Sequence, residues 1–187
     1  MYKCPDMSIA PPFNLHTWLE ENRDQLKPPV GNKNLYKDAE DYIVMVVAGP
    51  NARKDYHYNE TEELFYQLEG EIRVHIQEDG KKKTFRLGPG DMYLHPAGIP
   101  HSPERLPDSI GLVVERKRAA LGAKDGLLWF CDSCNHKLYE AYFPLEDIEK
   151  DFLKHFEHFY GSEQLRTCSE CGTVMEADPR FVAQKDS

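Results

Sequence analysis

Three residues in the first half of the chain have the types and the spacing of a metal site. His57 and Glu63 stand in the segment HYNETEE with five residues between them, and His101 ends the segment GDMYLHPAGIPH. Two imidazoles and one carboxylate on one face of an ion, with other positions left open, form the ligand set of non-heme Fe(II) sites. Because the open positions let a substrate and O2 bind side by side, the pattern predicts a site for iron–oxygen chemistry.

The glycines and prolines around these residues make the pattern more specific. The block from Gly90 to His101 reads G-x5-P-x-G-x2-H, and Glu63 is followed by six residues and then Gly70. These spacings resemble the two motifs of the cupin family, and the glycines permit sharp turns beside the ligands. The usual first motif has a second His where this chain has Asn59. The predicted ligand set is therefore two His and one Glu.

Other interpretations of these residues compete with the metal site. Taken alone, His57 and His101 could be ordinary structural histidines, as His75 and His95 in neighbouring strands are expected to be. Glu60 and Glu62 are rival carboxylate ligands. The period of two along a strand places Glu62 on the face opposite to Glu63, and only Glu63 has the six-residue spacing to the glycine. The metal interpretation is favoured.

Short strands with Gly and Pro between them must hold such a site. The patterns predict strands at 42–48, 63–70, 71–76, 84–87, 91–95 and 110–116. An Asp-Gly pair at 79–80 predicts a tight hairpin turn. Short strands at this spacing indicate a β-sandwich or barrel, and inward-facing positions of neighbouring strands can present ligands to one point.

Helical patterns flank this region. The segment 14–26 is predicted as a helix with Asn14 as its N-cap. Residues 117–126 are interpreted as a linker, and a helix is predicted over 144–160 with Pro144 at its start.

Four of the five cysteines form two C-x2-C pairs, Cys131 with Cys134 and Cys168 with Cys171, separated by 33 residues. Two such pairs predict a tetrahedral site with four sulfur ligands, which either zinc or iron fits. Cys4 is left over and is expected to be a free thiol. We therefore expect a catalytic barrel with the N-terminal helix over 1–122, and a metal-binding segment over 123–187.

The charge of the chain limits its partners. The 187 residues include 23 Lys and Arg against 32 Asp and Glu, for a formal net charge of −9. Binding to nucleic acid or to an anionic membrane surface needs a basic surface, so both are disfavoured. The longest apolar run, 43–48, is far too short to cross a membrane, and the N-terminal residues lack the layout of a secretion signal. A cytoplasmic protein is expected.

Three charged residues lie close in sequence to the metal pattern or at the end of a strand. Arg53 precedes His57 by four residues, Arg105 follows His101 by four, and Glu115 ends an apolar strand. Two arginines beside a metal site suggest an anionic substrate, because a guanidinium binds a carboxylate with two hydrogen bonds. On the residues alone, the alternative of surface ion pairs of little energetic value is favoured.

Longer stretches of the sequence decide whether Arg53, Arg105 and Glu115 belong to the site or form surface ion pairs. The chain resembles the 3-hydroxyanthranilate 3,4-dioxygenase family over nearly its whole length. The matching segments are PPVGN (28–32), VVAGPNARKDYH (46–57), EELFYQLEG (62–70), GDMYLHPAGIPHSPER (90–105), GLVVERKR (111–118), and the WFCDSC and RTCSECG segments of the short members. The resemblance implies a cupin, jelly-roll-like β-barrel, and it implies active-site roles for Arg53, Arg105, Glu115 and Asn32.

The resemblance also implies the reaction. Fe(II) held by His57, Glu63 and His101 would cleave the ring of 3-hydroxyanthranilate with both atoms of O2. The product, 2-amino-3-carboxymuconate semialdehyde, closes to quinolinate on the kynurenine route to NAD. Arg105 and Glu115 would bind the substrate, Arg53 would stabilise developing charge, and the cysteine site would hold a rubredoxin-like iron. The family is often homodimeric.

Two other functions remain as alternatives. Another cupin metalloenzyme, such as an isomerase or a thiol dioxygenase, would share the metal ligands without needing Arg53, Arg105 and Glu115 together. A metal-stabilised binding module that contacts nucleic acid through its cysteine site is disfavoured by the net charge of −9.

Overall fold

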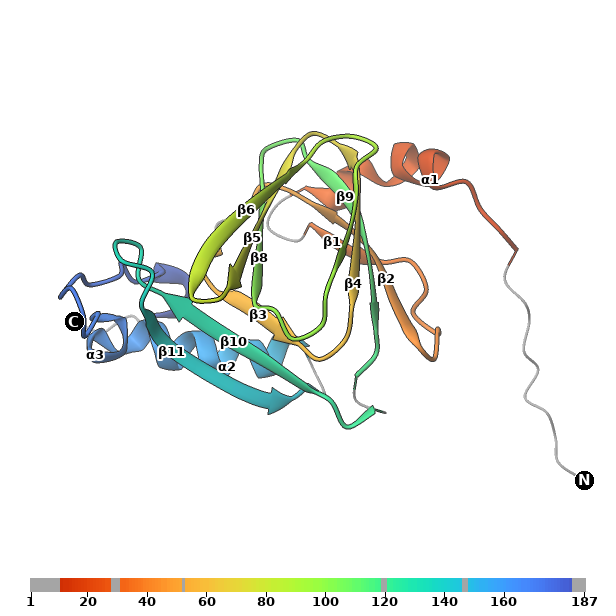
Figure 1. The fold of residues 1–187 in the computed structure, drawn as a ribbon. Coiled ribbons are helices and arrows are strands. Elements are labelled where there is room, and N and C mark those ends of the chain that lie inside the picture. Colours follow the sequence, from red (N-terminus) through yellow and green to blue (C-terminus); the bar gives the residue numbers. More distant parts are fainter. Residues whose placement is uncertain (1–10, 28–30, 52, 119–120, 146–147, 183–187) are drawn as a thin grey trace, which may run out of the picture.

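The computed structural model describes residues 11–27, 31–51, 53–118, 121–145 and 148–182. Two antiparallel sheets face each other as a barrel (Figure 1). In chain order the strands are β1 (Asn32–Asn34), β2 (Tyr42–Ala48), β3 (Tyr56–Asn59), β4 (Glu63–Glu69), β5 (Ile72–Glu78), β6 (Lys81–Leu87), β7 (Met92–His95), β8 (His101–Arg105), β9 (Ile110–Arg116), β10 (Lys124–Phe130) and β11 (Lys137–Pro144). The predicted fold class, a mainly β cupin-like barrel with an N-terminal helix and a C-terminal helix beside a cysteine cluster, is confirmed.

The order of the strands brings distant parts of the chain together. The 5-stranded sheet has the order β1-β2-β9-β4-β7, and the 6-stranded sheet has the order β11-β10-β3-β8-β5-β6. The sheets enclose a core that includes Phe65, Val74 and Val113. Each strand therefore presents alternate side chains to the barrel interior, where a site can be built from several strands.

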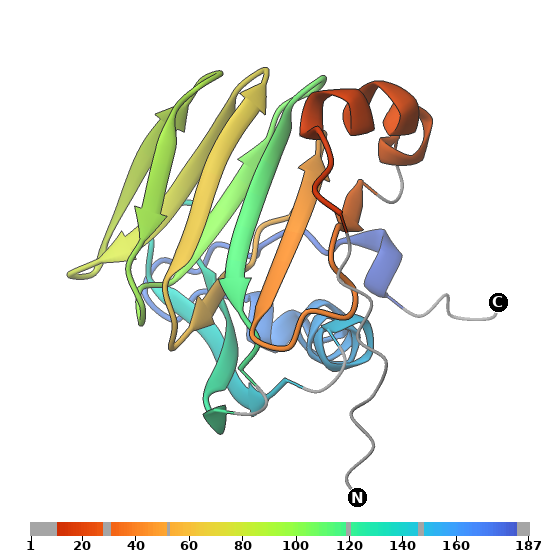
Figure 2. The same cartoon turned by 90° about the vertical axis from the view of Figure 1, so that its right-hand side faces the viewer.

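The N-terminal helix packs on the outer face of the 5-stranded sheet at one end, beside β2 (Figure 2). Asn14 caps helix α1 (Leu15–Asn22) by accepting a hydrogen bond from the backbone N–H of Thr17 at 3.1 Å, as predicted. The extent of the helix predicted over 14–26 is confirmed, but its last four residues form a 3-10 helix, η1 (Arg23–Leu26), that follows α1. Leu19 and Leu26 pack on Val46 of β2, on the side opposite to the barrel interior.

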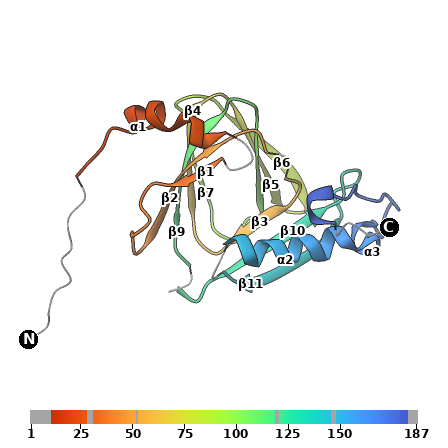
Figure 3. The same ribbon diagram turned by 180° about the vertical axis from the view of Figure 1, so that it is seen from behind.

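The C-terminal segment packs helices against an extension of the 6-stranded sheet. It contains α2 (Ile148–Gly161), α3 (Glu163–Arg166) and η3 (Pro179–Phe181), and Figure 3 shows α2 alongside β10 and β11. Trp129 of β10 stacks on Phe159 of α2 with ring centroids 4.4 Å apart. Because β10 pairs with β3, this segment shares a sheet with the barrel. The division of the chain at residues 122 and 123 stays a prediction.

Two expectations for this segment are wrong. Residues 117–126 are not a plain linker, since β10 begins at Lys124, and Asp125 is fully buried. Pro144 does not begin the helix over 144–160, because it ends strand β11, and the described helix begins at Ile148. Proline suits a strand end as well as a helix start, so the residue type alone could not decide.

The hairpin prediction is confirmed. Asp79 and Gly80 both adopt positive φ angles, 52° and 71°, between β5 and β6. A two-residue turn of this kind matches the twist of the flanking strands. None of the helices in the described ranges is long and apolar enough to cross a membrane.

Candidate metal centre and its cavity

The two sheets bring the three predicted ligands together. His57 on β3 and His101 on β8 are direct partners across the 6-stranded sheet, and their ring centroids lie 5.5 Å apart. Glu63 begins β4 in the facing sheet, and its Oε2 lies 3.1 Å from His101 Nε2. One ligand atom from each residue lies within 4.8 Å of the others. A single ion can be reached by all three side chains.

The donor set fits a divalent iron ion. Nε2 of His101 faces the carboxylate of Glu63 at 3.1 Å, so a nitrogen and an oxygen donor converge on one point. Burial raises the pKa of Glu63, but the neighbouring His101 outweighs this effect and lowers the pKa to about 2, so the carboxylate is ionised at neutral pH. Two nitrogens and one carboxylate oxygen with open positions suit Fe(II).

A cavity of about 600 Å³ opens directly on these residues. Its apolar wall includes Met45, Val47, Phe65 and Val113, which belong to the barrel core or pack against it. Its polar lining contains all the residues predicted for the iron and substrate site, namely Asn32, Arg53, His57, Glu63, His101, Arg105 and Glu115. A mainly apolar cavity with a few convergent polar groups is typical of a site for a small molecule. The structure thus places the predicted residues around one volume, and their roles stay predictions.

Arg105 is a buried cation that forms no salt bridge within the described residues, and the charge of Glu63 acts on it only from a distance. Its side chain is 3% exposed, and its Nη1 lies 3.4 Å from the carbonyl oxygen of Val47. Burial lowers the pKa of the guanidinium to about 10, which still leaves it charged at neutral pH. Gly111 makes room for it, because a Cβ there would lie 3.0 Å from Nη1. A buried charge of this kind is costly without a partner, so it favours an anionic ligand in the cavity.

Arg53 lies at the cavity beside the C-terminal helix. Asp55 holds it through Nη2 at 2.5 Å and Nε at 3.1 Å. Its guanidinium carbon lies 5.9 Å from the ring centroids of both Phe152 and Phe156 on α2. The side chain is 39% exposed. Partial desolvation lowers the pKa of Arg53, but the charge of Asp55 outweighs this effect and raises the pKa above its usual value. The arginine is therefore a fixed positive charge next to the predicted metal ligands.

Glu115 lies opposite Glu63 in the sheet. The two are partners between β9 and β4, and Glu115 is 5% exposed. Burial, followed by the charge of Glu63, raises the pKa of Glu115 above its usual value. Arg118 donates to its Oε2 at 2.5 Å and so partly opposes that shift. A carboxyl group with a raised pKa near a metal site can exchange protons with a bound ligand.

His95 packs against His101, one of the predicted metal ligands. It is completely buried, and its ring lies 4.3 Å from that of His101. Its Nε2 lies 2.7 Å from the carbonyl oxygen of Ile99, and its Nδ1 lies 3.1 Å from the hydroxyl of Tyr93. Burial, followed by the charge of His101, lowers its pKa to about 4. The expectation of a core or edge histidine fits this neutral, fully satisfied residue.

Sequence reasoning missed several residues of the site. Phe152 and Arg180 of the C-terminal segment line the same cavity, and Asp125 contacts His57. The only signal for Asp125 was its place two residues before the apolar run that starts at Leu127 of β10. No local pattern marks Phe152, which stands in an amphipathic helix like any core residue. Only the packing of α2 against β10 brings it to the cavity.

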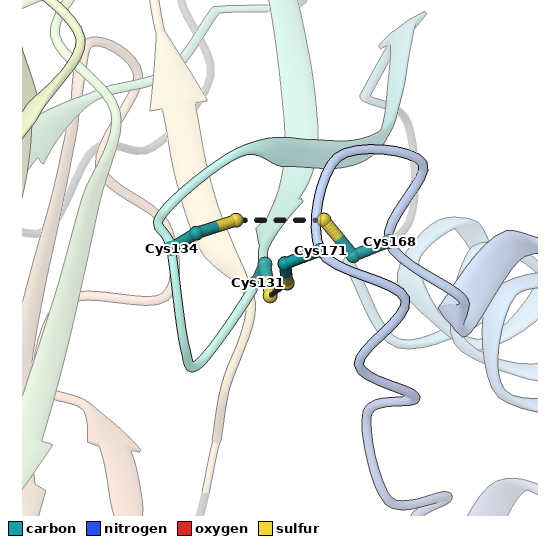
Figure 4. A group of neighbouring side chains, drawn as sticks. All are labelled: Cys131, Cys134, Cys168 and Cys171. Atoms are coloured by element: carbon teal, nitrogen blue, oxygen red, sulfur yellow. Dashed lines mark hydrogen bonds between the residues drawn. The ribbon is translucent and has the colours of Figure 1, made fainter.

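The four cysteines converge as predicted from the two C-x2-C pairs (Figure 4). The sulfurs of Cys131 and Cys171 lie 3.6 Å apart, and those of Cys134 and Cys168 lie 3.5 Å apart. A disulfide would need about 2.05 Å, whereas sulfurs around one tetrahedral ion lie well beyond that distance. After each pair, the next residue adopts a positive φ, 61° at Asn135 and 74° at Gly172. The two turns present four sulfurs to one point.

Fold and site together define a class, the cupin-type barrels with a candidate metal centre inside the barrel. Residues 7–160 match the model of the 3-hydroxyanthranilic acid dioxygenase family. The chain is 53% identical over 175 residues to the 3-hydroxyanthranilate 3,4-dioxygenase of Xanthomonas campestris pv. campestris (strain 8004), covering 94% of this chain and 98% of that protein. It is 42% identical over 164 residues to the enzyme of the same name from Bacillus thuringiensis (strain Al Hakam), covering 87% and 90%. The chain belongs to the 3-hydroxyanthranilic acid dioxygenase family.

Among the solved structures that resemble this chain is a cupin-2 domain containing protein from Shewanella frigidimarina NCIMB 400. It is 17% identical, covers 53% of this chain and 92% of its own, and has a TM-score of 0.45. The family assignment depends on the sequence relatives.

Proposed function

We propose that this protein is an Fe(II)-dependent enzyme that cleaves the ring of 3-hydroxyanthranilate with O2 and forms 2-amino-3-carboxymuconate semialdehyde. The proposal is supported by membership in the family and by relatives of that name that match almost the full chain. The observation in the structure that carries it is Arg105. A buried guanidinium that forms no salt bridge among the described residues and lines a cavity beside a two-His, one-Glu cluster suits a small carboxylate substrate.

In this proposal His57, Glu63 and His101 hold the iron. The bound Fe(II), with its open positions, supplies a place where the substrate and O2 meet. The second metal is held by the four cysteines and is either a rubredoxin-like iron or zinc. All four sulfurs are used by that ion, which leaves no open position, so we assign it a structural role.

The residues of the chain bind and orient the substrate. Arg105 donates two hydrogen bonds to the carboxylate from the barrel interior, where low polarity strengthens them. Glu115 accepts or orients the proton of the ring hydroxyl, a role for which its raised pKa suits it. Asn32, exposed at the cavity rim on β1, contributes a polar contact at the mouth.

Arg53 and the apolar walls complete the site. The guanidinium of Arg53, fixed by Asp55, stabilises negative charge that develops on the reacting groups. Phe65 and Val113 from the barrel and Phe152 from α2 surround the ring of the substrate and limit access of water.

The test uses the whole protein loaded anaerobically with Fe(II). On mixing with 3-hydroxyanthranilate and O2, we expect one O2 consumed per substrate and the absorbance of the yellow semialdehyde, which then decays as quinolinate forms. Metal-free protein is the control. A fully iron-loaded protein that yields no semialdehyde would refute the proposal and favour another metal-dependent cupin activity.

Further parts of the proposal concern the cell. The product places the reaction on the kynurenine route to NAD. Fe(II) and four cysteines that form no disulfide persist in a reducing compartment, which supports the cytoplasm. We also propose a homodimer, which sedimentation equilibrium of the purified protein would test.

A further inference from the structure

A chain of buried ionic contacts connects His57 to Glu115. Nε2 of His57 lies 2.7 Å from Oδ1 of Asp125. Arg118 donates to both oxygens of Asp125, from Nε at 2.9 Å to Oδ2 and from Nη2 at 2.8 Å to Oδ1. The same guanidinium donates from Nη1 to Oε2 of Glu115 at 2.5 Å. One arginine therefore holds two carboxylates, one facing a metal ligand and one lining the cavity.

These groups are buried to an extent that surface ion pairs are not. The exposed fractions are 0% for Asp125, 3% for Arg118 and 5% for Glu115. The Arg23–Glu69 pair, by contrast, has side chains 51% and 38% exposed. Removing charges from water costs several kcal/mol per ion, and a hydrophobic replacement is often at least as stable. Stability alone is thus a poor reason for this network, and its direction towards His57 and Glu115 suggests another.

The contact between Asp125 and His57 determines how the ring is held. With one ring nitrogen bound to the carboxylate, the imidazole cannot rotate freely, and its other nitrogen is left for an ion. Metal-binding histidines commonly have such a carboxylate partner, which fixes the ring orientation and strengthens the ligand. The position is also rigid, because Asp125 lies in β10 and pairs directly with Asn59 of β3.

Arg118 joins this contact to the other side of the cavity. It follows the end of β9, whereas Asp125 lies near the start of β10. The planar guanidinium satisfies both carboxylates at once, a geometry that the single ammonium of a lysine does not reproduce. A shift of Arg118 would move Asp125 and Glu115 together.

We infer that Asp125 and Arg118 are positioning residues of the active site: Asp125 orients the His57 ring towards the metal, and Arg118 holds Asp125 and Glu115 in fixed relation. The inference rests on the proposed function for the roles of His57 and Glu115. Neither Asp125 nor Arg118 lines the cavity, so both act through their neighbours.

The first test measures the affinity for Fe(II) without substrate, by anaerobic competition with a chromogenic chelator. Asp125→Asn keeps the shape of the side chain but loses its charge, and we expect an affinity about 10–100-fold weaker than that of the wild type. The matched control is Glu69→Gln, which removes an exposed carboxylate from an arginine elsewhere and should leave the affinity unchanged. An Asp125→Asn protein that unfolds cooperatively and binds Fe(II) as the wild type does would overturn the inference.

The second test uses Arg118→Lys with Arg23→Lys as its control. We expect Arg118→Lys to weaken Fe(II) binding and to lower kcat about tenfold or more in the iron-saturated enzyme. An Arg118→Lys protein with the Fe(II) affinity and the kcat of the wild type would overturn the role of Arg118. If Asp125→Asn alone does not fold, the double variant Asp125→Asn, Arg118→Gln removes the charge pair together, and wild-type affinity in that protein would overturn the inference. If wild-type enzyme fails to turn over 3-hydroxyanthranilate, the proposed function fails while the affinity test still decides the role of Asp125.

Discussion

At the scale of single residues, the site opposes the charge of the whole protein. The chain carries a formal net charge of −9, yet the cavity contains the buried Arg105 and the fixed charge of Arg53. Their effect in the cavity is local. Solvent and salt screen the field of distant surface charges, whereas they screen the interactions of charges inside the cavity much less. A small anion can therefore be bound inside a protein that repels large polyanions.

Arg105→Lys tests the binding of the substrate carboxylate. Lysine keeps the charge but loses the two-pronged donor geometry, so we expect KM for 3-hydroxyanthranilate to rise about tenfold, the equivalent of about 1.4 kcal/mol. Iron content should stay at the wild-type level, since Arg105 is not a ligand. Steady-state kinetics with metal analysis measures both, and Arg73→Lys, at a partly exposed pair with Glu71 and Glu104, is the control. An unchanged KM would show that the carboxylate binds elsewhere.

His95 predicts a dependence of stability on pH. Its pKa in the fold is about 4 against an ordinary value of 6.5, so the unfolded chain takes up the proton first as the pH falls. The stability is complete above pH 6.5 and is lost progressively towards pH 4, by about 3 kcal/mol for a shift of this size. Denaturant unfolding of the metal-free protein gives the free energy of unfolding at each pH. Between pH 6.5 and 4 it should fall more steeply for the wild type than for His95→Gln. Parallel curves for the two proteins across that range would contradict the prediction.

At the scale of the elements, the positions of strands decide which residues meet. The sequence pattern predicts β2 and β9 at their observed bounds, because both are continuous apolar runs. It does not predict β3 and β8, which carry the two histidines. β3 is only 4 residues long, and β8 contains Pro103, which removes a backbone donor. β3 and β8 pair because the barrel brings them together, and the strand propensity of their own residues would not predict it.

The candidate ligands were nevertheless predictable from the sequence. The spacing of Glu63 to Gly70 and of Gly90 to His101 reflects turns with positive φ, 64° at Gly70 and 91° at Gly90. Such turns leave a pattern in the residue types. The network of Arg118 and Asp125 was not predictable, because it depends on a pairing of β10 with β3 across 68 residues of sequence, as the His57–Asp125 contact shows.

Two phenylalanines of helix α2 face different surroundings, and only one of them should affect activity directly. Phe152 packs 5.4 Å from the His57 ring and lines the cavity, whereas Phe159 on the same helix stacks on Trp129 away from it. Each Phe→Ala change should cost about 3–5 kcal/mol of stability. Only Phe152→Ala should lower kcat/KM at a temperature where both variants are folded. Circular dichroism and kinetics on the pair measure this, and an equal loss of activity in both would point to a general effect of helix stability.

At the scale of the molecule, the cysteine cluster closes the C-terminal segment on itself. Cys131 and Cys134 follow β10, which is bonded to the barrel, and Cys168 and Cys171 follow the helices. A metal at this point connects the sheet to the end of the segment that supplies Phe152 and Arg180 to the cavity. Structural sites of four thiolates contribute directly to folding free energy.

Cys134→Ser should therefore destabilise the C-terminal segment and leave the barrel strands protected. With one sulfur ligand removed, we expect one metal fewer per chain, a lower Tm, and faster hydrogen exchange in peptides from β11, α2 and α3, while β4, β5 and β9 keep their protection. Ser133→Ala, in the same turn, leaves the sulfurs in place and is the control. Iron at the barrel site should remain, because its ligands come from β3, β4 and β8. Exchange that rises equally in the barrel strands and in α2 would mean that the two parts unfold as one unit, and an unchanged Tm would remove the structural role of the cluster.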